Sequence, residues 1–186
     1  MKRNNIDILL AVLLVIMAAT TRVVNAEMHL FNFVPIAAIG LFSGAVMKDR
    51  RMLAFLVPVL GQLLGDVFFQ LFTTTKGFYD VPGMLFNYGG LVAATALGTS
   101  MKNLKPTSVI GYLFGASTLF FLVSNFGYFI QGWNGYSFAG FTKTYIDAIP
   151  FFKNTITGDL VGGVALFGGF QALQIMLTNR AKKVKA

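Results

Sequence analysis

The segment Met52–Phe72, MLAFLVPVLGQLLGDVFFQLF, decides the fold class of this chain. A helix needs roughly 17 to 25 mostly apolar residues to cross the hydrocarbon core of a bilayer, and this segment meets that need. Its apolar and polar residues do not alternate, which excludes a strand of a transmembrane barrel. Gln62, Asp66 and Gln70 recur at four-residue intervals, so a helix places them on one inward face. The sequence therefore predicts a membrane-spanning helix with one polar face.

The composition of the whole chain agrees with a membrane protein. Of its 186 residues, 12% are charged and 55% are hydrophobic, whereas about 25% of residues are charged in an ordinary soluble domain. The chain has no Cys and a single His, His29, which excludes a disulfide framework and disfavours a zinc or iron site. We therefore expect an integral membrane protein without a bound metal or cofactor.

Five further apolar stretches lie around this segment, and we expect an all-α bundle of six transmembrane helices in a single domain of residues 1–186. The six predicted spans cover residues 8–24, 31–47, 52–72, 84–101, 108–131 and 156–178. Between the last two spans, Phe138, Phe141, Tyr145 and Ile149 fall on one helical face. This spacing predicts an amphipathic helix over 138–149 at the external mouth of the bundle, ended by Pro150.

The basic residues divide unequally between the two sides of these spans. One side carries eleven of the fifteen, namely Lys2, Arg3, Lys48, Arg50, Arg51, Lys102, Lys105, Arg180, Lys182, Lys183 and Lys185. The other side carries Arg22, Lys76, Lys143 and Lys153. The positive-inside rule places the richer side, and with it both termini, in the cytoplasm. The net charge of +8 thus indicates topology, and we expect no nucleic-acid partner.

The N-terminal region allows a second interpretation. Lys2-Arg3, the apolar run 8–19 and Val24-Asn25-Ala26 before Glu27 have the order of a signal peptide. Cleavage after Ala26 would leave five spans. N-terminal sequencing of the membrane-extracted protein distinguishes the two interpretations.

Small residues recur at four-residue spacing in several of the predicted helices, as in Gly40 and Gly44 or Gly158 and Gly162. Such faces let transmembrane helices approach closely. They serve either packing inside the bundle or docking of another membrane subunit, and for docking we single out Gly40, Gly44 and Gly162.

Polar and aromatic residues concentrate in the external half of the predicted bundle. Amides alternating with aromatics and glycines are typical of a small-molecule pocket. We therefore predict an outward-facing pocket built from Arg22, Asn32, Asp66, Asn87, Asn125, Tyr128, Trp133, Asn134 and Asp159.

The two aspartates of this set have alternative interpretations. Asp66 belongs either to a substrate or proton site or to an interhelical hydrogen-bond cluster, and with no basic residue expected at its depth we predict that it is neutral. Asp159 is expected near the external start of the sixth helix, where a carboxylate also complements the helix dipole.

Enzyme motifs are incomplete in this chain. The stretch Ile156-Thr157-Gly158-Asp159 lacks the first glycine of the Gly-x-Gly-Asp motif of intramembrane aspartyl proteases, and Gly40-Leu41-Phe42-Ser43-Gly44 has the wrong spacing for a Gly-x-Ser-Gly serine protease motif. No phosphate-binding Gly-Lys-Ser/Thr loop is present. We therefore expect a protein that is not an enzyme.

Several stretches together resemble a bacterial family of uncharacterised transport proteins, which is itself similar to the substrate-binding (S) components of energy-coupling factor vitamin transporters. They are AATTR (18–22), NFVPIAA (32–38), GQLLGD (61–66), SNFG (124–127), GWNGY (132–136) and GDL (158–160). The resemblance implies a six-helix S-component-like fold in the bacterial cytoplasmic (inner) membrane. It also implies uptake of a vitamin or cofactor precursor bound near the outer surface.

The resemblance also implies a transmembrane coupling subunit driven by ATPases. The Ala-x-x-x-Ala pattern that S components use for docking in their first helix is broken here, because Val15 follows Ala11. The first external connection is similar to that of solitary cobalamin transporters, which makes cobalamin one candidate substrate. The alternative from another functional class is a non-transporting structural or assembly subunit of a larger membrane complex.

Overall fold

The computed structural model describes residues 3–30, 32–74, 77–78 and 81–185, with side chains described for these residues except 3–5 and 181–185. Phe31, where the second predicted span begins, and Lys2 and Lys76 of the charge distribution lie outside the described residues. The described residues form α-helices and one short 3-10 turn, with no strand among them. The predicted all-helical fold is therefore confirmed.

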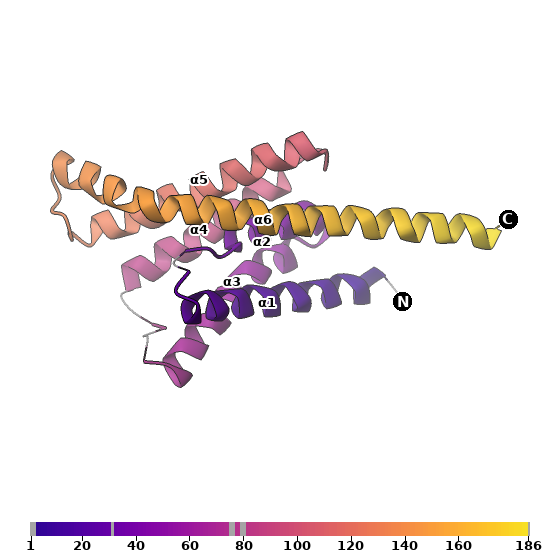
Figure 1. The fold of residues 1–186 in the computed structure, drawn as a ribbon, viewed down its shortest axis with the longest axis horizontal. Helices are drawn as coiled ribbons and strands as arrows, with labels where there is room; N and C mark the ends of the chain where they lie inside the picture. Colours follow the sequence, from indigo (N-terminus) through magenta and orange to yellow (C-terminus); the bar gives the residue numbers. More distant parts are fainter. Residues whose placement is uncertain (1–2, 31, 75–76, 79–80, 186) are drawn as a thin grey trace.

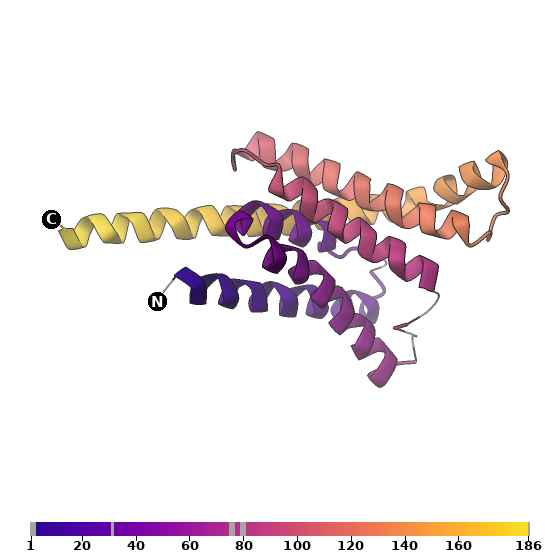
Figure 2. The same cartoon turned by 180° about the vertical axis from the view of Figure 1, so that it is seen from behind.

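The helices form a bundle in which the two chain ends lie at the same end (Figure 1). The elements in chain order are α1 (Arg3–Glu27), α2 (Ile36–Val46), η1 (Lys48–Arg50), α3 (Arg51–Phe72), α4 (Val81–Thr99), α5 (Pro106–Ile130) and α6 (Phe138–Lys185). The reverse view shows α3, α4 and α5 in front of α2 and α6 (Figure 2). Helix α1 packs mainly on α3, and α5 lies between α4 and α6.

Four of the helical segments are long and apolar enough to cross a membrane: Ile6–Glu27, Lys48–Phe72, Pro106–Ile130 and Phe138–Arg180. Helices α2 and α4 are not among them. Helix α2 has only 11 residues, which is about 16 Å of helix against a hydrocarbon core of about 30 Å. The predicted span 31–47 is therefore shorter in the structure than a full crossing, because helix α2 begins only after Pro35.

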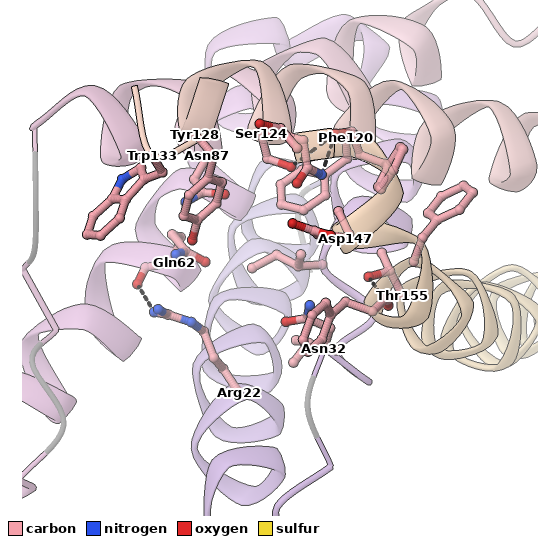
Figure 3. A pocket seen from close by; sticks show the side chains of 18 of the residues that line it. Arg22, Asn32, Gln62, Asn87, Phe120, Ser124, Tyr128, Trp133, Asp147 and Thr155 are labelled. Carbon is pink, nitrogen blue, oxygen red and sulfur yellow. Dashed lines mark hydrogen bonds between the residues drawn. The ribbon is translucent and has the colours of Figure 1, made fainter. Parts of the chain in front are cut away.

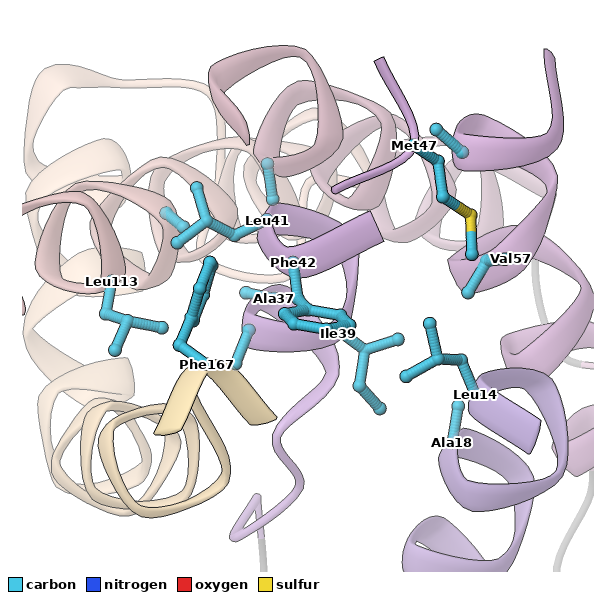
Figure 4. Packing of buried hydrophobic residues seen from close by; sticks show 14 of the residues in the cluster. Leu14, Ala18, Ala37, Ile39, Leu41, Phe42, Met47, Val57, Leu113 and Phe167 are labelled. Carbon is cyan, nitrogen blue, oxygen red and sulfur yellow. The ribbon is translucent and has the colours of Figure 1, made fainter. Parts of the chain in front are cut away.

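Helix α2 forms the centre of the bundle. All nine residues from Ile36 to Gly44 are buried, and α2 contacts each of the other five α-helices. A helix that is apolar all round has no face for water, and its short length makes the interior of the bundle its stable place. Phe42 packs edge-to-face on Phe167, with ring centroids 5.1 Å apart, and Figure 4 shows the surrounding apolar side chains.

The small-residue faces are used mainly inside the chain. A Cβ atom added at Gly44 would overlap the main-chain carbonyl of Thr95 on α4, and one at Gly40 would lie 3.0 Å from the Thr95 hydroxyl oxygen. A Cβ atom at Gly162 would overlap the ring of Pro35. The structure thus places the three glycines singled out for docking in internal contacts. By contrast, Gly111 and Gly168 have open space where a side chain would be.

The last predicted span and the amphipathic segment before it are one helix. Helix α6 runs without interruption through Pro150, so the prediction that Pro150 ends a separate helix over 138–149 is wrong. Two residues of the apolar face of 138–149 pack on α5: Phe141 meets Phe129, and the Tyr145 hydroxyl donates to the Leu122 carbonyl (2.9 Å). These contacts attach the first turns to α5, and the helix bends in this orange region (Figure 1).

Candidate functional site

A cavity of about 560 Å³ is lined by residues from each of the α-helices, most of them from α5 and α6. Trp133 and Asn134 of the α5–α6 connection line it, and this connection lies at the end of the bundle opposite the two termini (Figure 1). Figure 3 shows the lining side chains. Its volume falls in the range of sites that hold drug-sized ligands. The lining combines amide, hydroxyl and aromatic side chains with two charged residues, Arg22 and Asp147.

The structure brings seven of the nine residues predicted for a pocket to this one cavity. They come from α1, the α1–α2 connection, α4, α5 and the α5–α6 connection, and they are Arg22, Asn32, Asn87, Asn125, Tyr128, Trp133 and Asn134. The two aspartates of the predicted set, Asp66 and Asp159, do not line it. Residues more than a hundred positions apart in the sequence therefore share one surface.

Helix α5 contributes one of its faces to the cavity. Phe121, Ser124, Asn125 and Tyr128 follow the spacing of neighbours on one helical face. The Asn125 Nδ2 atom donates to the Phe121 carbonyl one turn earlier (2.8 Å), which fixes the orientation of the amide. Sequence reasoning identified Asn125 and Tyr128 but missed the preceding turn, although the helical spacing alone includes it.

Helix α6 contributes a second face that the sequence interpretation missed entirely. Its lining residues are Thr144, Asp147, Ala148, Phe151, Phe152 and Thr155, again at the spacing of one helical face. This face crosses Pro150, where the sequence interpretation placed a helix end. The signal was present in the spacing, but only a helix that continues through the proline reveals it.

Asp66 stands directly behind the cavity wall and holds Arg22. The Asp66 carboxylate is fully buried, with its Oδ1 atom 2.6 Å from Arg22 Nη1 and its Oδ2 atom accepting from the Tyr88 hydroxyl (2.6 Å). Arg22 Nη1 also donates to the Gln62 carbonyl (3.0 Å), the contact drawn in Figure 3. The expectation that no basic residue reaches the depth of Asp66 is therefore wrong, because α1 extends far enough to bring Arg22 beside α3.

Gly65 and Phe69 help to fix the position of the Arg22 side chain. A Cβ atom added at Gly65 would lie 2.8 Å from Arg22 Nη1, so a glycine at this position leaves room for the guanidinium. The guanidinium carbon lies 5.3 Å from the ring centroid of Phe69, within the range of a cation–π contact. Packing and charge together fix the orientation of the one cation among the residues lining the cavity.

The predicted polar stripe of the third span divides in the structure. Gln62 lines the cavity and Asp66 is buried behind it. Gln70 instead is exposed near the end of α3, where its Oε1 atom accepts from the main-chain N–H of Phe78 (3.4 Å). The inward face of α3 therefore ends before Gln70.

Asp159 lies in the core and not in the cavity. Its side chain is fully buried, with Oδ1 accepting from the main-chain N–H of Ala38 (2.9 Å) and Oδ2 from the Ser117 hydroxyl (2.7 Å). Because α6 begins at Phe138, the prediction that Asp159 lies near the start of its helix is wrong. The carboxylate instead meets the N-terminus of α2, where Pro35 supplies no side-chain cap.

The remaining groups of the cavity are held by local contacts. Asp147 Oδ2 lies 2.7 Å from Lys143 Nζ, one turn earlier on α6, and Asn134 Nδ2 donates to the Thr144 hydroxyl (3.1 Å). Asn32 adopts a left-handed backbone conformation (φ 60°), which asparagine tolerates better than most residues. Within the described residues, no group of three or more His, Asp or Glu side chains could hold a metal ion.

A comparison with known protein families identifies the chain. A family model matches residues 2–181, so the chain belongs to the DUF6580 family, a family of unknown function. No curated protein and no solved structure matches the chain.

Proposed function

We propose that this member of the DUF6580 family is a membrane-embedded binding or transport component for a small nutrient, such as a vitamin or cofactor precursor. The observation that carries the proposal is the cavity of about 560 Å³ with its amide and aromatic lining. A few well-placed polar groups among apolar walls are the usual make-up of a small-molecule site.

The charge distribution supports an orientation for this component. Lys48, Arg50 and Lys105 lie at the end of the bundle that carries the termini, where the Lys48 Nζ atom contacts the Met101 carbonyl and Arg50 pairs with Asp7 (3.2 Å). Under the positive-inside rule this end faces the cytoplasm of a bacterial inner membrane. The cavity then opens toward the outside, as uptake requires.

Six helices and an outward cavity agree with an arrangement like that of S components, and we carry this resemblance forward as part of the proposal. In that arrangement the bundle binds the nutrient, and a separate coupling subunit with ATPases drives its release. No residue in the cavity is assigned a catalytic role.

A thermal unfolding experiment tests the binding function. The purified protein in detergent is heated with each member of a panel of vitamins and cofactor precursors, cobalamin included. We expect at least one compound to raise the unfolding temperature, because a ligand that binds only the folded state stabilises it. The Asn125→Leu variant should lose this shift, whereas a variant of Tyr136, which does not line the cavity, should keep it.

Two outcomes of this experiment would contradict the proposal. The first is that no compound in the panel shifts the wild-type protein. The second is that a compound shifts the wild type and the Asn125→Leu variant equally, which would place its binding outside the cavity.

The alternative function, a structural or assembly subunit of a larger membrane complex, is favoured by one observation. Gly111 and Gly115 line a shallow groove with Leu97 and Tyr112 near the other end of α5, and Gly168 and Gly169 on α6 have no close neighbour. Such faces allow close approach of another helix. Stable stoichiometric co-purification with enzyme subunits at native expression would favour this alternative over the binding function.

A further inference from the structure

We infer that the ligand of this cavity is an uncharged, planar molecule that carries several N–H or O–H donors. The inference rests on the proposed binding function and names the chemical class of its ligand. Three features of the cavity support it: the pairing of its charges, the direction of its hydrogen bonds and the number of its aromatic faces.

Both charged residues that line the cavity, among the described residues, are already paired within the protein. Arg22 is paired with the buried Asp66 at 2.6 Å, and Asp147, whose side chain is about half exposed to solvent, is paired with Lys143 at 2.7 Å. A charged ligand would leave water for a site whose charges already cancel, and such a transfer is unfavourable without a free counter-charge. The charge balance of the site therefore favours an uncharged ligand.

Several polar groups of the cavity offer acceptors to a ligand, beside the donors of the Arg22 guanidinium. The Asn125 and Asn134 amides direct Nδ2 at the Phe121 carbonyl and the Thr144 hydroxyl. These neighbouring oxygens accept from the amides and so fix which side of each amide is nitrogen. The amide carbonyl oxygen then remains to accept from a ligand, beside the second N–H of each Nδ2 atom.

Three hydroxyl groups of the cavity can likewise accept a hydrogen bond from a ligand. Thr144 donates to the Gly140 carbonyl (2.9 Å), Thr155 to the Phe151 carbonyl (3.2 Å) and Ser124 to the Phe121 carbonyl (3.4 Å). A hydroxyl that has given its hydrogen to a helix carbonyl can only accept a further bond. A ligand with several N–H or O–H donors complements this set of oxygens.

Aromatic side chains supply the walls of the cavity. Its lining includes Phe120, Phe121, Tyr128, Trp133, Phe151 and Phe152. Phe121 and Phe152 pack with ring centroids 4.3 Å apart and an interplanar angle of 31°. Flat faces of this kind bind best to a flat ring, stacked or edge-on.

A capture experiment identifies the class of ligand from a mixture of cellular compounds. The purified protein in detergent is incubated with the small-molecule fraction of a bacterial cell extract and separated from unbound solutes. Bound compounds are then released by heat and identified by mass spectrometry. Their charge at neutral pH follows from electrophoretic mobility.

A matched pair of variants shows which compounds occupy the cavity. Phe151→Ala removes an aromatic ring from the cavity wall. Phe138→Ala removes a ring from the same helix, but Phe138 is 85% exposed and does not line the cavity. We expect the retained compound to be uncharged and ring-bearing. Its amount should fall about tenfold in Phe151→Ala, since losing one stacked ring weakens binding by roughly that factor, and should stay unchanged in Phe138→Ala.

The outcomes separate this inference from the function on which it rests. A charged or non-planar compound whose retention depends on Phe151 would overturn the inference and leave the binding function standing. An uncharged planar compound retained equally by Phe151→Ala would overturn the inference, because it would bind elsewhere. If wild type retains no compound above the level of a protein-free detergent control, both the binding function and the inference fail.

Discussion

The two fully buried aspartates, Asp66 and Asp159, differ in what their carboxylates bind: Asp159 binds groups of the packed core, and Asp66 binds a side chain that lines the cavity. In the core region, Asp159 binds the N-terminus of α2 and the Ser117 hydroxyl, and every one of these partners is itself part of the packed interior. In the cavity region, Asp66 binds Arg22, whose guanidinium also lines a cavity. Burial alone therefore does not distinguish a structural acid from one that supports a site, whereas the exposure of its partner does.

The core region should show the largest loss of stability. We expect Asp159→Ala to lower the free energy of unfolding by about 3 kcal/mol, because it leaves the buried Ala38 N–H without its acceptor, takes one of two acceptors from the Ser117 hydroxyl and opens a cavity in the core. Asp159→Asn keeps an acceptor oxygen and should lose less. Thermal or denaturant unfolding in detergent measures both variants, and an Asp159→Ala protein as stable as the wild type would remove the structural role assigned to Asp159.

The cavity region should show a smaller loss that depends on both partners. Arg22→Gln and Asp66→Asn should each lower the free energy of unfolding by about 2 kcal/mol, because the first leaves the buried Asp66 carboxylate unpaired and the second leaves the partly buried Arg22 guanidinium without its counter-charge. The double variant should lose less than the sum, by about 1 kcal/mol, since it removes both charges together.

The exposed pair Lys143–Asp147 serves as a control for this double-mutant cycle. Its side chains are more than half exposed, so Lys143→Gln should change stability by less than about 0.5 kcal/mol. Strictly additive losses at Arg22 and Asp66 would show that the two residues do not act as a pair.

Gly→Ala substitutions should change the free energy of unfolding less than loss of a buried aspartate, and they should distinguish glycines packed in the core from glycines on open helix faces. Gly44→Ala forces a methyl group against the Thr95 carbonyl, and we expect a loss of about 1–2 kcal/mol. Gly168→Ala adds the same methyl group in open space and should be neutral or stabilise the helix by about 0.5 kcal/mol. Equal effects of the two substitutions, measured by thermal unfolding, would contradict the packing of α2 on α4.

The sequence was sufficient for the helical fold and for much of the cavity lining, because apolar length and helical spacing are local properties. The segment Met52–Phe72 forms α3 (Arg51–Phe72) as predicted, and seven of the nine proposed pocket residues line one cavity. Asparagines and aromatics gathered toward one end of several helices were the signal that identified them.

The remaining features depend on contacts between distant parts of the chain. Helix α6 continues through Pro150 because its first turns pack on α5, and no local pattern reports that packing. Because the sequence interpretation began the last helix too late, it placed Asp159 near the helix start. The same error kept the cavity-lining face of α6, from Thr144 to Thr155, from being recognised. The Arg22–Asp66 pair joins positions 44 residues apart in the sequence. The pair forms because α1 packs on α3, and no local sequence pattern predicts that packing.

The fluorescence of Trp133 tests the central claim, that the cavity binds a small molecule, most directly. Trp133 is the single tryptophan of the chain, lines the cavity and is 75% exposed. Its emission is followed while the purified protein is titrated with the compound that most raises the unfolding temperature. We predict a saturable change in the wild type that requires at least about tenfold more compound in Phe151→Ala. An unchanged Trp133 emission at concentrations that stabilise the protein would show that the ligand binds elsewhere and would contradict the assignment of the cavity.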